Sequence, residues 1–125
     1  MFVRFQSPLP TPSGRYPGLF ALANQLADEG RLSAEDRTWW RENNDWFNDA
    51  YVEPGSVDPT IFDRELHPIT CCWFKERTAE HLLARVPGYL RLLDKYEVPW
   101  VELRSDDPGT VVYEDDVQVV VWLHD

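Results

Sequence analysis

Hydrophobic positions along the chain recur with two different periods, and the change of period separates a helical part from a strand-rich part. Between residues 79 and 96 apolar side chains recur every three or four positions, with charged side chains between them, which predicts an amphipathic helix. Pro87 interrupts this pattern, because proline has no N–H to donate and its ring crowds the preceding turn. We therefore expect either a kink or a second helix with Pro87 at its first position.

After Pro99 the period changes to the alternation that is typical of strands. Three strands are predicted there, over residues 100–103, 111–113 and 117–123. The run 119–122 is apolar on both faces, which favours a central strand over an edge strand. Residues 2–6 are composed of strand-forming residues, and we expect them to join the same sheet.

The region between these strands contains two further predicted helices and a long loop. The first helix covers residues 19–27 and ends before Gly30, which occupies the place of a left-handed C-terminal residue. The second begins after Ser33, a natural N-cap, and carries its apolar face to residue 51. Residues 52–72 show little periodicity and predict a loop, apart from a short helix over 60–64 that Asp58 would cap.

These elements predict an α+β fold, in which about three helices pack on a small, mostly antiparallel sheet of about four strands. The 125 residues are expected to form a single compact domain over 1–125, because this length is near the commonest domain size. Hydrophobic residues make up 43% of the chain and aromatic residues 14%, so an intrinsically disordered chain is excluded.

The distribution of charge limits the classes of partner. The formal net charge is −10. From Glu102 to the end of the chain there are seven acidic side chains, whereas Arg104 is the one Lys or Arg in this stretch. Like charges repel phosphate groups, so we expect no nucleic-acid binding and no binding to an anionic membrane surface. No apolar run approaches the ~20 residues of a membrane span, and no signal peptide is recognisable. A soluble protein in the reducing cytoplasm is the expectation.

His67, Cys71 and Cys72 form the first group of candidate chemical residues. A structural zinc site needs four ligands, and the side chains of adjacent cysteines point apart, so we expect no metal site and no cofactor. Buried, inert thiols are the preferred interpretation. The alternative is a catalytic thiol, Cys71 or Cys72, activated by His67 or by a helix N-terminus.

The predicted helix after Ser33 carries the second group, an aromatic face that includes Trp39, Trp40 and Trp46. Large aromatic side chains at helical spacing are usually core, and the alternative is the wall of a binding site. Asn43 lies on the same face, where its side chain bonds either a buried group or a ligand; a structural bond is the preferred interpretation.

A third group consists of Arg4 and Glu114, which would meet across the sheet beside an aromatic wall if both lined a pocket for a polar small molecule. The acidic turns 106–107 and 114–116 lie at opposite ends of one predicted strand. Because a strand rises about 3.3 Å per residue, the two turns are too far apart for a paired-carboxylate site. Solvated turns are the preferred interpretation.

Three stretches carry a resemblance to other proteins: WWRENNDWFNDAY at 39–51, WFKERTAEHLL at 73–83 and DPGTVVYEDDVQVVV at 107–121. Together they resemble a group of short, uncharacterised actinobacterial proteins, and the resemblance covers most of the chain. It implies a small bacterial soluble domain. It transfers no activity and no site residues.

Two functional hypotheses follow. The first is a non-catalytic interaction module, an acidic domain that binds a basic protein partner as an inhibitor or immunity-type protein would. The second is a small enzyme or small-molecule-binding protein, with a pocket between the 52–72 loop, the tryptophan-rich helix and the sheet. Charge and the lack of a recognised catalytic motif favour the first hypothesis, whereas the long loop and the surplus of aromatic residues favour the second.

Overall fold

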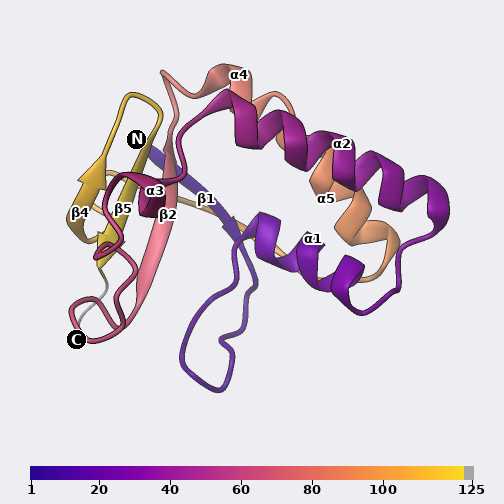
Figure 1. Cartoon of the computed structure of the whole chain (residues 1–125), viewed down its shortest axis with the longest axis horizontal. Helices are drawn as coiled ribbons and strands as arrows, with labels where there is room; N and C mark the ends of the chain where they lie inside the picture. The colour runs from indigo at the N-terminus through magenta and orange to yellow at the C-terminus, as the bar shows by residue number, and fades with distance from the viewer. Residues whose placement is uncertain (123–125) are drawn as a thin grey trace.

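In the computed structural model, which describes residues 1–122, five antiparallel strands form one sheet with the order β3-β1-β2-β5-β4 (Figure 1). The strands are β1 (Phe2–Gln6), β2 (Thr70–Lys75), β3 (Val101–Ser105), β4 (Thr110–Glu114) and β5 (Gln118–Trp122). The α+β prediction is confirmed, and the apolar strand β5 is internal as expected. Leu123, the predicted end of this strand, lies outside the described residues.

Strand β2 is the element that the sequence patterns miss, and it raises the strand number from the expected four to five. Residues 52–72 are predicted as loop, with the amphipathic helix following. In the structure β2 lies between β1 and β5, where Cys71 pairs with Val121 and Trp73 with Val119. The strand is only six residues long and follows a long irregular segment, so its pairing partners define it better than its own pattern does.

Three helices have ten or more residues: α1 (Leu19–Asp28), α2 (Ala34–Ala50) and α5 (Val86–Lys95). Two single-turn helices, α3 (Pro54–Val57) and α4 (Glu80–Leu83), complete the helical part. Pro87 lies in the first turn of α5, so the break in the amphipathic pattern separates two helices. Of the two expectations for Pro87, the second helix is therefore the one observed. No helix of the described chain is long and apolar enough to span a membrane.

The local helix signals are mostly confirmed. Ser33 accepts a hydrogen bond from the N–H of Asp36 at the start of α2, and Gly30 has a φ of 69° after α1. The short helix predicted over 60–64 is wrong. The side chain of Asp58 instead accepts two hydrogen bonds from Thr60, which makes a local turn there, and the nearest helix, α3, lies earlier in the chain.

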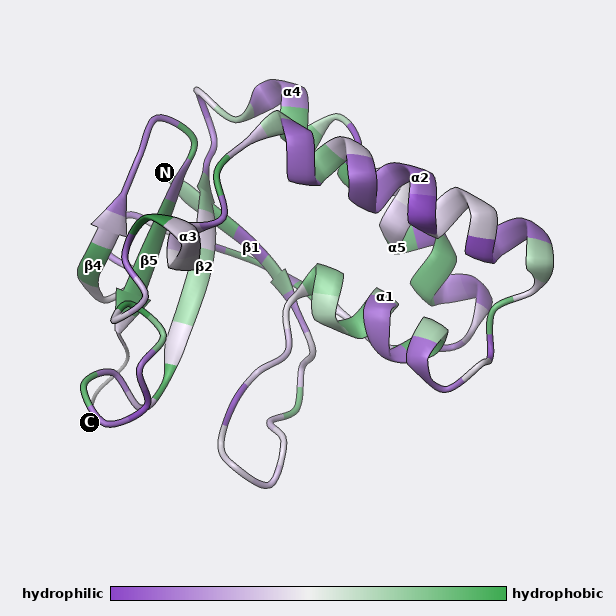
Figure 2. Ribbon diagram, viewed as in Figure 1, coloured by the Kyte–Doolittle hydropathy of each residue, from purple (hydrophilic) through white to green (hydrophobic). Residues whose placement is uncertain are grey.

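The main hydrophobic core lies between the sheet and the long helices, which are grouped together in Figure 1. Val3 and Phe5 of β1 face α1, and Tyr89 of α5 is completely buried at the centre of this cluster. Figure 2 shows hydrophobic residues along much of β2 and β5, whereas hydrophilic residues cover much of α2. The amphipathic pattern of the helices therefore determines which of their faces meets the sheet.

The sheet is strongly curled. Its two edge strands, β3 and β4, are joined by residues 106–109 only, so the five Cα steps from Ser105 to Thr110 reach about 18 Å at most. Edge strands of a flat five-stranded sheet would lie about 19 Å apart, so the sheet must bend. Inside the bend lies a second, smaller hydrophobic cluster, which contains the side chains of Cys71, Trp73, Val119 and Val121.

Candidate functional site

A cavity of about 690 Å³ opens beside the sheet. Its lining comes from β1, most of β2 and Gln118 of β5, from the segment 11–21 with the start of α1, from the C-terminal end of α2, and from part of the segment 53–70. Arg15 donates a hydrogen bond of 3.1 Å to the carbonyl oxygen of Pro68, which ties the first of the two loops to the second.

The cavity exists because β1 and β2 separate. They pair only at Phe2 with Lys75 and at Val3 with Phe74, whereas β1 pairs with β3 along five residues. Beyond Val3 the free side of β1 pairs with the returning chain instead, through a bridge between Gln6 and Gly18. A strand has two hydrogen-bonding sides, so the returning chain takes the place that β2 would otherwise occupy.

Arg4 occupies the junction of these three chain segments. Its Nη1 donates to the carbonyl oxygen of Cys72 at 2.9 Å, its Nη2 to that of Tyr16 at 2.7 Å, and its Nε to the side chain of Gln6 at 2.7 Å. The residue is 8% exposed and lines the cavity. All three acceptors are neutral oxygens, and none of the ion pairs among residues 1–122 includes Arg4. The junction therefore holds a buried positive charge without a neutralising carboxylate.

An aromatic wall, formed by Phe20, Phe47, Tyr51 and Phe74, lines the side of the cavity towards the helices. The rings meet edge to face in sequence: the centroids of Phe20 and Phe47 lie 4.8 Å apart, those of Phe47 and Tyr51 6.3 Å, and those of Tyr51 and Phe74 6.1 Å. Such contacts hold aromatic rings in fixed orientations. The wall is therefore a rigid apolar surface that a ligand could contact.

Cys72 places a thiol in the cavity. The residue is exposed by surface area, yet protein atoms surround the cavity that it faces. Burial raises the pKa of this thiol, Arg4 acts in the opposite direction, and Cys71 and Glu53 add to the rise, with a result of about 11. At neutral pH the side chain is consequently a thiol and not a thiolate, so it is a poor nucleophile.

Further polar groups in the cavity lining include Tyr51 and Glu53. Burial raises the pKa of the Tyr51 phenol well above its usual value, and nearby Cys72, Asp115 and Glu53 act in the same direction. The phenol therefore remains neutral and can both donate and accept a hydrogen bond. The arrangement can bind a molecule through two cations, Arg4 and Arg15, several other polar groups and a large apolar surface.

Of the predicted binding residues, only Arg4 lies in the cavity lining. Trp40 is buried and donates to the side-chain oxygen of Asn24, while Trp39 packs against Tyr89 with 5.0 Å between ring centroids. Trp46 is covered by the guanidinium of Arg85, 3.7 Å from its ring centroid. These tryptophans pack within the helical layer, and α2 contributes to the cavity only through its last turns.

Asn43 and Asn44 both make structural hydrogen bonds, and that of Asn43 is the kind the sequence favours. Asn43 donates to the carbonyl oxygen of Trp39 within its own helix, which is a structural bond. Asn44, which the sequence analysis does not single out, donates to Asn24 at 2.9 Å and accepts from the hydroxyl of Tyr89. Asn44 thus joins α1, α2 and α5 through one hydrogen-bonded network.

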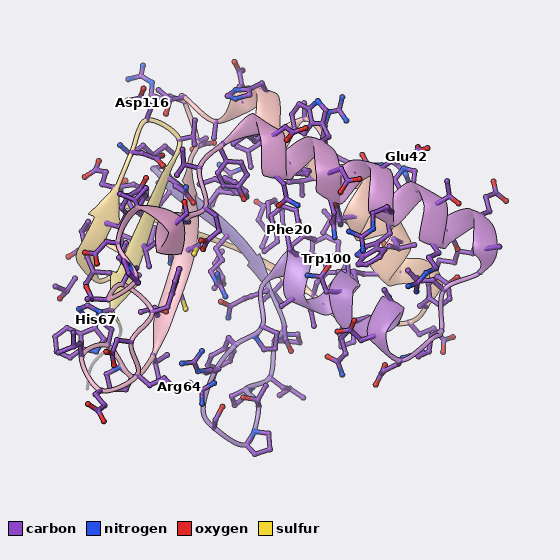
Figure 3. The ribbon with its side chains drawn as sticks, viewed as in Figure 1. Phe20, Glu42, Arg64, His67, Trp100 and Asp116 are labelled. Atoms are coloured by element: carbon purple, nitrogen blue, oxygen red, sulfur yellow. The ribbon has the colours of Figure 1, made fainter. Side chains whose placement is uncertain are left out.

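His67 is not brought together with the thiols in the described structure. Its Nδ1 lies 2.9 Å from the carbonyl oxygen of Ile61, and its ring meets that of Trp122. Figure 3 shows His67 well separated from Phe20, which belongs to the aromatic wall. Cys71 is buried in the smaller cluster inside the curled sheet. Within residues 1–122 no three His, Cys, Asp or Glu side chains group closely enough to hold a metal ion.

Glu114 lies away from Arg4, because β2 and β5 separate their strands, and it forms an ion pair with Lys75. The turn after β4 is organised by Asp115, whose side chain accepts hydrogen bonds from the N–H groups of Val117 and Gln118. Burial alone would raise the pKa of Asp115, but the bonds from Gln118, Val117 and the Tyr113 hydroxyl lower it overall. This carboxylate is therefore part of the fold.

Sequence reasoning misses most of the cavity lining, including Gly18, Phe20 and Tyr51. One signal was available: the segment 7–18 is rich in proline and glycine, which indicates a loop that is held by its own turns. What the pattern does not show is that this loop returns beside β1 and displaces β2.

Compared with protein-family models, curated proteins and solved structures, the chain gives no significant match. The resemblance to actinobacterial proteins therefore stays a prediction, and the cavity is interpreted from its own geometry and chemistry.

Proposed function

We propose that this protein binds a small organic molecule in the cavity between the sheet, the end of α2 and the segment 53–70. The observation that supports the proposal is the cavity itself. Its volume of about 690 Å³ lies within the range of about 300–1,000 Å³ that is typical of ligand sites. Its lining also has the character of such a site, since most of the surface is apolar and polar side chains are placed among the apolar ones.

We propose that the cavity binds a ligand, and not that Cys72 acts in it as a catalytic nucleophile. A reactive cysteine needs a low pKa and a neighbouring base, whereas burial raises the pKa of Cys72 and no histidine among residues 1–122 lines the cavity. Cys72 serves better as a neutral, polarisable surface that a ligand can contact.

The acidic interaction module stays a prediction that ranks second. Several carboxylates near the C-terminus make contacts with other residues of the protein. Glu102 pairs with Arg104, Glu114 pairs with Lys75, and Asp115 organises a turn. These carboxylates contribute less to a surface for a basic partner than their number suggests. A complex with a basic protein that weakens steeply with added salt would reverse this ranking.

The test is to block the cavity. The side chain of Cys72 faces the cavity from a strand that also suits aromatic residues, so Cys72→Phe should fill the space without removing a core contact. A matched control is Val111→Phe on the edge strand β4, because Val111 is exposed and does not line the cavity.

Saturation-transfer NMR with a panel of small aromatic fragments should show binding to the wild type and to Val111→Phe. We expect Cys72→Phe to lose this binding while it keeps its circular dichroism spectrum and its cooperative unfolding. Equal binding by Cys72→Phe would show that the fragments bind elsewhere, and a wild type that binds no fragment would contradict the proposal.

A further inference from the structure

We infer that the ligand is an organic carboxylate with an apolar body, whose charged group pairs with Arg4 and whose body lies against the aromatic wall. This inference rests on the proposed function and adds the chemical class of the ligand. It starts from Arg4, the charged side chain buried in the cavity wall.

The first argument is the charge of Arg4. A guanidinium group does not lose its proton in a protein, so its positive charge persists however deeply it is buried. Burial of an uncompensated charge is costly, and buried charges are normally paired. Arg4 is 8% exposed, and its three acceptors in the described structure are neutral oxygens of Gln6, Tyr16 and Cys72. An anion in the cavity would supply the missing partner.

Arg4 also has N–H donors that its three hydrogen bonds within the protein do not use. A guanidinium carries five N–H groups, of which the described bonds use one on each of the three nitrogens of Arg4. One N–H remains on Nη1 and one on Nη2, which matches the two oxygens of a carboxylate. The residue beneath these two nitrogens is Gly18, where an added Cβ would lie 3.4 Å from each of them. The lack of a side chain leaves room beside the guanidinium.

The rest of the lining argues for one negative charge on an apolar body. The aromatic wall offers a surface for hydrocarbon or ring atoms, which a free inorganic anion would leave uncovered. Arg15 and Glu53 are also part of the lining, and the formal charges of Arg4, Arg15 and Glu53 sum to +1, which one negative charge on a ligand would neutralise. A monocarboxylate satisfies both conditions better than a nucleotide or another polyanion.

The test compares 3-phenylpropionate with 3-phenylpropanamide, a neutral molecule of nearly the same shape, by isothermal titration calorimetry. We expect the wild type to bind the carboxylate at least about tenfold more tightly, since a charge-assisted bond to Arg4 is lost in the amide. Equal affinity for the two would overturn the inference while the proposed function stands. Binding of neither would overturn both.

Variants then test whether Arg4 causes the preference for the carboxylate. Arg4→Gln should reduce the preference for the carboxylate to about unity and leave binding of the amide within about threefold of the wild type. The matched control is Arg64→Gln, because Arg64 is exposed, does not line the cavity and carries the same charge (Figure 3). This control should keep the full preference.

Arg4 also holds the junction of three chain segments, so Arg4→Gln could unfold. Arg4→Lys covers that case: it keeps the charge and one donor group, and we expect it to retain a reduced preference for the carboxylate. A full preference for the carboxylate in whichever of the two variants folds would show that Arg4 is only structural.

Discussion

Two regions of the molecule place polar side chains among apolar ones, and they do so in opposite ways. Between α1, α2 and α5, the polar groups of Asn24, Trp40, Asn44 and Tyr89 bond one another in a closed network. At the cavity, Arg4 has two N–H groups beyond those that bond its three acceptors in the described structure. A buried polar group whose hydrogen-bond partners belong to the protein has a structural role. A buried polar group that lacks such partners points to a bound ligand.

The largest effect should come from breaking the closed network. Asn24→Ala removes the oxygen that accepts from both Trp40 and Asn44 and leaves two donors without a partner. We expect the free energy of unfolding to fall by about 2–3 kcal/mol in urea titrations. Asn43→Ala is the matched control, since Asn43 bonds only its own helix, and it should change stability by less than about 0.5 kcal/mol. Similar losses in both variants would contradict the network.

Cysteine reactivity should separate the two sides of β2. Cys72 faces the cavity, and its pKa of about 11 means that its reaction with iodoacetamide accelerates about tenfold per pH unit from pH 7 up to that value. At pH 8 we expect alkylation on the order of 100-fold slower than for a free cysteine. Cys71, buried inside the curled sheet, should react only after unfolding.

Mass spectrometry of the alkylated peptides would assign each modification. Rapid labelling of Cys72 at pH 7 would instead restore the interpretation of this residue as a nucleophile. Protection of Cys72 by 3-phenylpropionate at pH 9 would further support the proposed site.

The smallest expected difference in the free energy of unfolding is between variants of two tyrosines. Burial raises the phenol pKa of both Tyr89 and Tyr51. The Tyr89 hydroxyl donates to Asn44, so Tyr89→Phe should lower the free energy of unfolding by about 1.5 kcal/mol. Tyr51 lines the cavity, where water can reach its hydroxyl, so Tyr51→Phe should cost less than about 0.5 kcal/mol. Equal losses in thermal unfolding would show that the two regions do not differ as described.

The placement of the aromatic residues shows how far sequence reasoning reaches into the candidate site. The pattern after Ser33 correctly indicates one apolar face, and it also suggests Trp39, Trp40 and Trp46 as binding residues. None of these three lines the cavity, whereas Phe47 of the same face does. Position along a helix relative to its neighbours decides which aromatic residues are enclosed and which border a space, and no local pattern contains that information.

The sequence by itself determined the α+β class, the long helices with their boundaries at Ser33 and Pro87, and the internal position of β5. These follow from periodicity, capping and proline chemistry, which act over a few residues. Only the tertiary structure decided that β2 is a strand, that the chain returning at Gly18 separates it from β1, and that Arg4 is buried there. Strand pairing and burial depend on segments about 70 residues apart, such as Arg4 and Cys72 (68 positions), and are therefore properties of the assembled fold.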